Sequence, residues 1–377
     1  MAREGAALLL AAIKSAVNGT EFTGMQPEMS GDVYALAKAH DMAHLVAEAL
    51  DGAGVPGGEH GALLQRARLT AVFRAEQLEE ALATLRRVLT AVEIPFLPLK
   101  GAVIRNFYPE PWQRTSCDID VLVREEQLDA AAEALVRDGG FTLGGKGSHD
   151  VSLYSAAGVH VELHYTLAEA HTPLAVQQIL STVWAHTDVK GVEHVLHDDF
   201  FCFYHIAHMA KHFMMGGCGI RPLLDLWLMQ QHMPLTEASL ALLSAGGLST
   251  FAAAAVKLAA VWFGEASHDD LTLRMEAFIL RGGVYGTEQN QIAVAQKKRG
   301  KLGYLLSKVF LPCQRLQYQY PVLQRHKWLY PVCTVRRWCR LLFGGEWRRV
   351  RRTLRVNASL SPAAVRAAGE LFEELSI

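Results

Sequence analysis

The chain has 377 residues, more than one minimal domain needs, so two or three units of ordinary size are expected. Half of the residues are hydrophobic and 20% are charged, which is globular composition, and the formal net charge of −1 excludes overall charge as a reason to bind nucleic acid. The charge is unevenly distributed. Residues 296–355 contain sixteen Lys or Arg and one acidic residue, or about +15, so the remainder carries about −16. We expect these parts to attract each other or to bind different partners.

The cysteines and the apolar segments indicate the compartment. Six cysteines are scattered without a Cys-x-x-Cys pair, so neither a disulfide framework nor a cysteine zinc site is predicted, and a reducing cytoplasm fits. The apolar run 6–13 is too short for a secretory signal and is followed by Lys14. The longest apolar block, 251–263, is too short to span a bilayer. A cytoplasmic protein without a transmembrane segment is therefore expected.

The first hundred residues change from a helical to an extended pattern. Residues 5–51 show helical periodicity with a gap near 18–31, and a long amphipathic helix is predicted over 62–92, after a Gly/Pro turn at 52–61. The apolar run 94–99 contains two prolines, which favours an edge strand or a strand entry. A short helix over 102–107 and a loop over 108–112 should follow.

The middle of the chain alternates strands and helices before becoming helical. The predicted elements are a strand over 117–124, a helix over 125–138 stopped by Gly139-Gly140, and a hairpin of strands 150–155 and 158–165. From residue 174 nearly everything reads as helix, including segments 199–215, 221–232, 237–245, 249–263 and 269–281. We predict an α+β fold with a small mixed sheet, divided into a helical region 1–90, a core 91–190, a helical domain 191–295 and a basic helical region 296–377.

Two aspartates lie in the predicted strand 117–124. Asp118 and Asp120 are two residues apart, so the strand period of two puts both carboxylates on one face while Ile119 and Val121 take the other. Two like charges in one small space are unfavourable unless a proton or a cation lies between them, and hard divalent cations bind carboxylate oxygens. These residues therefore predict a metal site.

A third acid lies in the second strand of the predicted hairpin. There His160, Glu162 and His164 alternate with apolar residues and share one face. If the two strands are adjacent, three carboxylates converge and can hold one or two Mg²⁺ ions that orient a nucleoside triphosphate. The alternative is a half-exposed strand whose polar face meets water, because any antiparallel strand can show such alternation.

The two acidic strands are accompanied by further motifs, which together read Lys100-Gly101, Tyr108-Pro109, Arg114, Asp118-Ile-Asp-Val-Leu-Val and Val161-Glu-Leu-His164. This set resembles a known family, the uncharacterised bacterial nucleotidyltransferases of the polymerase β superfamily. Downstream it extends to residues 196–230, with three histidines and Asp225, and to Phe310-Leu-Pro, Tyr320-Pro and Leu329-Tyr-Pro. It thus covers most of the chain.

The resemblance implies an enzyme that transfers a nucleoside monophosphate from an NTP such as ATP to an acceptor. Asp118 and Asp120 would bind Mg²⁺ or Mn²⁺, and Glu162 would be the third acid, catalytic and metal-binding. The superfamily usually has a Gly-Ser loop for the triphosphate, whereas this chain has Lys100-Gly101 without a neighbouring serine. Phosphate binding through the Gly101 N–H and the Lys100 ammonium is physically reasonable. The departure leaves open a changed donor, or a catalytically inactive protein that binds a nucleotide or a partner.

Two arginines are further candidates for phosphate binding. Arg114 can reach a phosphate or the aspartates from a loop, the alternative being a surface arginine. Arg221 can face a nucleotide phosphate or pair with Asp225 four residues later. Cys117, beside the aspartates, lacks a paired base and is interpreted as core packing.

Three histidines share one stripe of the predicted helix 199–215. His205, His208 and His212 are spaced three and four residues apart, which allows a mononuclear zinc site, hydrogen-bonded packing or the lining of an acceptor pocket. The zinc interpretation would make the protein a histidine-dependent metal hydrolase. It is weaker than a His-Glu-x-x-His motif because no glutamate accompanies the histidines.

The basic segment interleaves tryptophans with arginines. Such a composition can bind nucleic acid or an anionic membrane surface, the alternative being a helical appendage whose charges face solvent or the acidic remainder. A polyanion is therefore a candidate partner at this segment. The acceptor is not defined by the sequence, since a small molecule, a protein side chain and an RNA end would require the same donor site.

Overall fold

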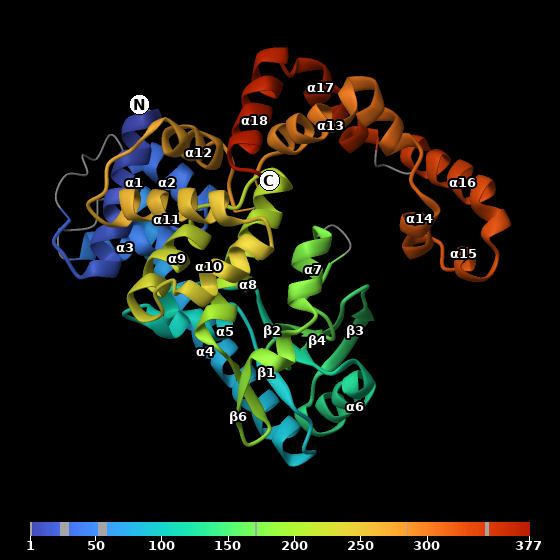
Figure 1. Ribbon diagram of the computed structural model, residues 1–377, viewed down its shortest axis with the longest axis horizontal. Helices are drawn as coiled ribbons and strands as arrows, with labels where there is room; N and C mark the ends of the chain where they lie inside the picture. Colours follow the sequence, from blue (N-terminus) through green and yellow to red (C-terminus); the bar gives the residue numbers. More distant parts are fainter. Residues whose placement is uncertain (1, 23–29, 52–58, 170–171, 285, 344–346) are drawn as a thin grey trace.

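The computed structural model describes residues 2–22, 30–51, 59–169, 172–284, 286–343 and 347–377 (Figure 1). The N-terminal helices are α1 (Ala2–Asn18), α2 (Ser30–Ala39), α3 (Ala43–Asp51) and the long α4 (Glu59–Ala91). They confirm the predicted helical pattern of 5–51 and the amphipathic helix of 62–92. Half of the predicted gap and most of the Gly/Pro turn lie outside the described residues.

Seven strands form one mixed sheet in the order β3-β4-β5-β2-β1-β7-β6. Their bounds are β1 (Phe96–Pro98), β2 (Asp118–Val123), β3 (Thr142–Lys146), β4 (Asp150–Tyr154), β5 (His160–His164), β6 (Thr187–Lys190) and β7 (Glu193–Leu196). The sheet, with helices before and after it, confirms the predicted α+β class.

Strand β1 is internal, so of the two alternatives predicted for 94–99, an edge strand or a strand entry, the edge strand is wrong. Phe96 faces Val123 of antiparallel β2 and Glu193 of parallel β7. The two prolines do not prevent this because Pro95 precedes the strand and Pro98 is its last residue. Only three residues pair, so a missing N–H at either end costs little.

The two strands that carry the acidic residues match their predicted bounds and faces. In β2 the side chains of Ile119, Val121 and Val123 enter a core with those of Val161 and Leu163 from β5. The polar residues of both strands therefore share the opposite face. The hairpin joining β4 to β5 turns with Gly158 at φ +76°, a left-handed conformation that favours glycine.

Three strands had no clear signal in the sequence. Every residue of β3 is exposed, so its Thr-Leu-Gly-Gly-Lys segment shows no apolar alternation. The β6–β7 hairpin turns at Gly191 and interrupts the region after residue 174 that was predicted to be almost wholly helical. Because both β3 and β6 are edge strands, they need few buried side chains, which explains their weak patterns.

Helices cover the sheet from both sides. Short helices connect the strands: α5 (Gly101–Ile104), η2 (Arg105–Phe107), η3 (Pro111–Gln113), η4 (Glu125–Gln127), α6 (Leu128–Gly139), α7 (Leu174–Leu180) and η5 (Val183–His186). On one face, α4 and α6 contribute Leu85 and Leu135 to the core of the sheet. Helix α6 ends at Gly140, whose φ of +68° confirms the predicted glycine stop.

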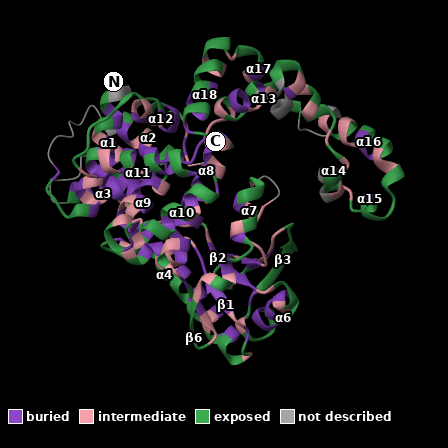
Figure 2. Ribbon diagram, viewed as in Figure 1, coloured by how far each residue is buried: buried purple, intermediate pink, exposed green. Residues whose placement is uncertain are grey.

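The opposite face of the sheet meets a large helical core. Its C-terminal part comprises α8 (Asp198–Met214), α9 (Arg221–His232), α10 (Glu237–Ala245), α11 (Ser249–Phe263) and α12 (Asp270–Leu280), as predicted within a few residues. Leu9 and Leu45 of the N-terminal helices share this core with Phe203 and Phe251. Figure 2 shows the buried residues concentrated where these helices meet.

The basic region continues as an extended helical arrangement. It contains α13 (Glu288–Val309), α14 (Cys313–Gln319), α15 (Val322–Arg325), η6 (Lys327–Leu329), α16 (Tyr330–Phe343), α17 (Trp347–Ser359) and α18 (Pro362–Glu374). Helix α18 returns Leu371 and Phe372 to the large core, whereas α14–α16 extend away from it (Figure 1). Within the described residues, no helix is long and apolar enough to cross a bilayer. All six cysteines are free thiols.

Candidate functional site

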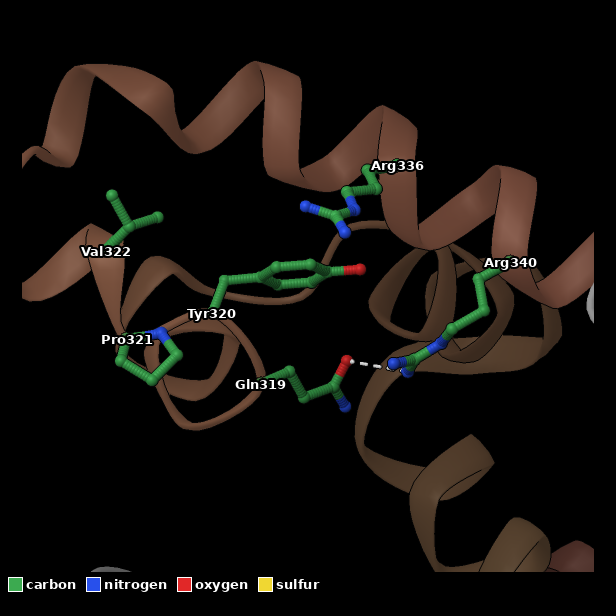
Figure 3. Close-up of a pocket in the computed structure, with 6 residues that line it drawn as sticks. All are labelled: Gln319, Tyr320, Pro321, Val322, Arg336 and Arg340. Atoms are coloured by element: carbon green, nitrogen blue, oxygen red, sulfur yellow. Dashed lines mark hydrogen bonds between the residues drawn. The ribbon is translucent and has the colours of Figure 1, made fainter.

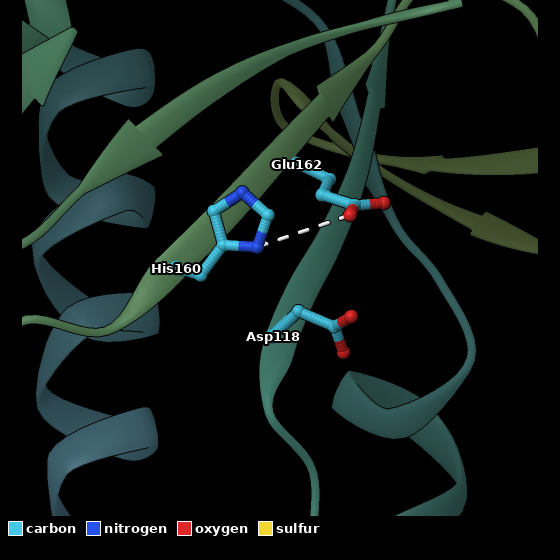
Figure 4. A group of neighbouring side chains, drawn as sticks. All are labelled: Asp118, His160 and Glu162. Carbon is cyan, nitrogen blue, oxygen red and sulfur yellow. Dashed lines mark ion pairs between the residues drawn. The ribbon is translucent and has the colours of Figure 1, made fainter. Parts of the chain in front are cut away.

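The acidic residues converge as predicted. Strands β2 and β5 pair in parallel, with Asp118 opposite His160 and Asp120 opposite Glu162. One potential ligand atom from each of Asp118, His160 and Glu162 lies within 4.8 Å of the others (Figure 4). The same holds for Asp120, Glu162 and His164. Glu162 belongs to both groups, so these five residues form one continuous cluster, which we call the acid cluster.

Two cationic side chains neutralise Asp120. Lys100 Nζ and His164 Nε2 each lie 2.8 Å from Asp120 Oδ1, and His164 Nε2 lies 3.4 Å from Glu162 Oε2. Burial opposes ionisation of Asp120, but Lys100 and His164 outweigh it and hold the pKa of this carboxyl below its usual range. Burial lowers the pKa of His164, yet its bonds to Asp120 and Glu162 raise it to about 9. His164 is therefore protonated at neutral pH.

Asp118 has the opposite electrostatic balance. Burial and then the neighbouring charges of Asp120 and Glu162 raise the pKa of its carboxyl. Ser116 Oγ lies 3.0 Å from Asp118 Oδ1 and 2.7 Å from its backbone oxygen, so this hydroxyl orients the residue. A divalent cation between these carboxylates would favour their ionised forms, and the oxygen-rich donor set suits Mg²⁺ or Mn²⁺. The residues present therefore fit the predicted metal.

The Lys100-Gly101 turn lies directly against the acid cluster. Lys100 has φ +43°, an uncommon conformation for a residue with a side chain, and directs its ammonium to Asp120. A Cβ on Gly101 would lie 2.5 Å from Arg114 Nη1 and 3.4 Å from Ser116 Oγ, so the close packing requires glycine. The serine that the sequence lacks beside this glycine is thus brought near by the fold. Sequence reasoning missed Ser116, although its place two residues before Asp118 is typical of a local hydroxyl turn.

Arg114 is buried and its charge is matched by Asp225. Its Nε and Nη2 lie 2.9 and 2.8 Å from the two carboxylate oxygens, and the Tyr108 hydroxyl donates to Oδ1 at 2.8 Å. The interpretation of Arg114 as a surface arginine is therefore wrong, and so is a pair between Arg221 and Asp225. The bidentate bond fixes the loop before β2 to helix α9, which positions Ser116 and the start of the aspartate strand.

Arg221 and Cys117 also differ from expectation. Arg221 pairs with Asp41 and lies 3.0 Å from Thr115 Oγ1, joining helix α9 to the N-terminal helices. Cys117 is exposed at the edge of the site, so its assignment to core packing is wrong. It directly precedes β2, where the chain has not yet entered the sheet.

The acid cluster forms one wall of a cavity of about 390 Å³. Arg114 and Arg221 also line it, as do His205, His208 and His212 of helix α8. His205 Nε2 donates to the Pro222 carbonyl at 2.9 Å, and the facing Nε2 atoms of His208 and His212 lie 3.2 Å apart. Within the described residues, the only sets of three potential ligands whose atoms lie within 4.8 Å of one another belong to the acid cluster. The three histidines of α8 therefore do not form the zinc site that was the alternative prediction. They combine hydrogen-bonded packing with the lining of the cavity.

Burial also sets the protonation of these histidines. Desolvation, followed by the charges of Lys211 and Lys100, lowers the pKa of His212 to about 4, and desolvation lowers the pKa of His208 well below its usual value. The histidine-lined part of the cavity is therefore neutral at neutral pH. Lys211 beside it is paired with Glu169 at 2.5 Å.

The fold and the cavity define a protein with a clustered acidic site on two parallel strands beside a Lys-Gly turn. A family described as uncharacterised nucleotidyltransferase matches residues 27–264, more than half of the chain, and the protein belongs to this family. The matched region contains the sheet, the acid cluster and the cavity wall of helix α8. No curated protein and no solved structure matches the chain.

Proposed function

We propose that the protein transfers a nucleoside monophosphate from an NTP to a hydroxyl or phosphate of an acceptor and releases pyrophosphate. The observation that carries the proposal is the convergence of Asp118, Asp120 and Glu162 in the wall of one cavity. Membership of a nucleotidyltransferase family supports it. Asp118, Asp120 and Glu162 would hold Mg²⁺ or Mn²⁺, which when bound neutralises charge on the phosphates.

The remaining residues would bind and orient the phosphates. Lys100 has three N–H donors and gives one to Asp120, so it can keep this contact while donating to a phosphate above the cluster. The Gly101 N–H at the adjacent turn would be a second donor. Arg114 and Arg221 line the same cavity and add positive potential, although each is also held by an aspartate.

Glu162 is the candidate base for the acceptor. It is half-buried and reaches both groups of the acid cluster. Its bond with His164 lowers the pKa of its carboxyl, despite partial burial, so it is ionised at neutral pH and can accept a proton from an acceptor hydroxyl. The neutral histidines of α8 would then form the acceptor side of the cavity.

The test combines binding and turnover. Calorimetry with each NTP and Mn²⁺, and a pyrophosphate-release assay with Mg²⁺, should show metal-dependent nucleotide binding that Asp118→Asn and Glu162→Gln abolish. Asp188→Asn, an exposed aspartate at the far edge of the same sheet, is the matched control and should leave binding unchanged. Absence of both nucleotide binding and metal-dependent protection against melting would refute the catalytic proposal.

One observation favours a second candidate function, a catalytically inactive nucleotide-binding protein. Asp120 Oδ1 already accepts two charge-assisted hydrogen bonds, from Lys100 and from His164, so this carboxylate is charge-paired without a metal. Nucleotide binding that is equally tight with EDTA and with Mg²⁺, without pyrophosphate release, would identify this alternative.

A further inference from the structure

Residues 313–343 form an arm with a small core of its own. The arm comprises α14, α15, η6 and α16, and its core consists of Leu316, Leu323 and Cys333. Figure 1 shows it extending beyond α13 and α17, apart from the large helical core. One face of α16 covers this core, where Cys333 and Thr334 are buried. The other face of the helix is left to solvent.

The outer face of α16 is apolar along one line. Val332, Val335 and Cys339 are exposed and are spaced three and four residues apart, so they form one stripe of the helix. Trp328 just before the helix is 74% exposed, and Val332 is 60% exposed. An apolar stripe on the outer face of a helix is unfavourable in water and marks an interaction surface when it is bordered by polar groups.

Two arginines border the stripe. Arg336 and Arg340 lie four residues apart on α16 and line a cavity of about 580 Å³ together with Gln319, Tyr320, Pro321 and Val322 (Figure 3). The Arg336 guanidinium lies 5.9 Å from the centre of the Tyr320 ring, and Arg340 Nη2 donates to Gln319 Oε1 at 3.3 Å. The six lining residues include two guanidinium groups and no carboxylate. Such a cavity fits a phosphate anion.

We propose that the arm docks on an anionic lipid surface, with Trp328, Val332 and Val335 at the level of the acyl boundary and Arg336 and Arg340 at the phosphates. The arm itself contains six Lys or Arg and no acidic residue, which provides the charge complementarity. A nucleic acid would satisfy the arginines but would leave the valines in water. A lipid surface satisfies both features at once, because it combines surface phosphates with an apolar interior. Docking of the arm does not require the proposed transfer reaction.

Vesicle flotation with the full chain tests the proposal. We expect the protein to float with vesicles that contain phosphatidylglycerol and to remain unbound with phosphatidylcholine alone. Replacing both arginines (R336Q/R340Q) should weaken the partitioning about 30-fold, because each cation near the surface contributes about a factor of five. Replacing both valines (V332S/V335S) should weaken it about tenfold while leaving its salt dependence unchanged.

The matched control removes the same charge elsewhere. Arg351 and Arg355 are also exposed and four residues apart, on α17, and R351Q/R355Q should change the partitioning much less. Circular dichroism and melting of each variant verify that it folds. The proposal would be overturned if the two arginine variants lost vesicle binding equally. It would also be overturned if the protein bound both kinds of vesicle equally or bound neither. Binding of single-stranded RNA that R336Q/R340Q abolishes, without vesicle binding, would assign the surface to nucleic acid instead.

Discussion

The buried pair of Arg114 and Asp225 offers the sharpest test of how the site is held together. Only 9% of the Arg114 side chain and 2% of the Asp225 side chain are exposed, and the carboxylate accepts two bonds from the guanidinium and one from Tyr108. Asp225→Asn would leave a buried guanidinium without its counter-charge. We expect it to lower the free energy of unfolding by about 3–5 kcal/mol, the usual cost of breaking such a pair from one side.

Urea unfolding followed by circular dichroism measures this loss. Asp138→Asn serves as the control because Asp138 pairs with Arg137 at the surface, where solvent screens the charges, and it should change stability little. Replacing both buried partners by apolar residues (R114M/D225L) should cost less than Asp225→Asn alone, since no unpaired charge remains. The reasoning is refuted if Asp225→Asn destabilises no more than Asp138→Asn, or if the double variant is the least stable.

Three further predictions concern the turn, a buried histidine and an exposed thiol. Gly101→Ala places a Cβ 2.5 Å from Arg114 Nη1, so urea unfolding should show a loss of about 1–3 kcal/mol, and calorimetry should show weakened nucleotide binding. Burial lowers the pKa of His44 to about 4, below its unfolded value, so the full stability is present above pH 6.5 and falls as the pH decreases toward 4. At pH 5 the free energy of unfolding should be lower by about 2 kcal/mol. Melting experiments across this pH range should show the loss in the wild-type protein and not in H44Q. Cys117 lines the cavity and is exposed, so Mg²⁺ and an NTP should slow its reaction with a thiol reagent, whereas the reaction of Cys339, which is also exposed, should be unchanged. A Cys117 rate that is the same with and without Mg²⁺ and the NTP would contradict the placement of the nucleotide.

The sequence predicted the fold best where burial imposes a strict period. The alternation at Ile119 and Val121 exists because one face of β2 is packed against α4 and α6, and the long helices were visible for the same reason. Edge strands lack this constraint, so β3 and β6 were missed. Strand β1 was misplaced because prolines usually indicate an edge, whereas here they lie at the ends of a pairing segment of three residues.

The acid cluster was predictable, but its electrostatic partners were not. Local spacing alone put Asp118 with Asp120 and Glu162 with His164. The pairing of Arg114 with Asp225 instead joins residues 111 positions apart, and no local pattern reports such a contact. The metal, the donor nucleotide and the acceptor depend on this three-dimensional arrangement together with ligands, so they stay predictions.

Replacing Lys100 distinguishes a metal-dependent enzyme from a protein whose Asp120 is paired only with Lys100 and His164. Its ammonium lies 2.8 Å from Asp120 Oδ1, where it reduces the attraction of the cluster for a divalent cation. Lys100→Met should therefore raise the affinity for Mn²⁺ on the order of tenfold, seen as a larger metal-induced increase in melting temperature, because one competing positive charge is lost. The same variant should bind an NTP more weakly, because the ammonium no longer donates to the phosphates. If the affinities for Mn²⁺ and for the NTP both fall in Lys100→Met, Lys100 stabilises the fold of the site and does not bind a phosphate. If Mn²⁺ stabilises neither the wild-type protein nor the variant, the carboxylates pair only with Lys100 and His164 and do not bind a metal.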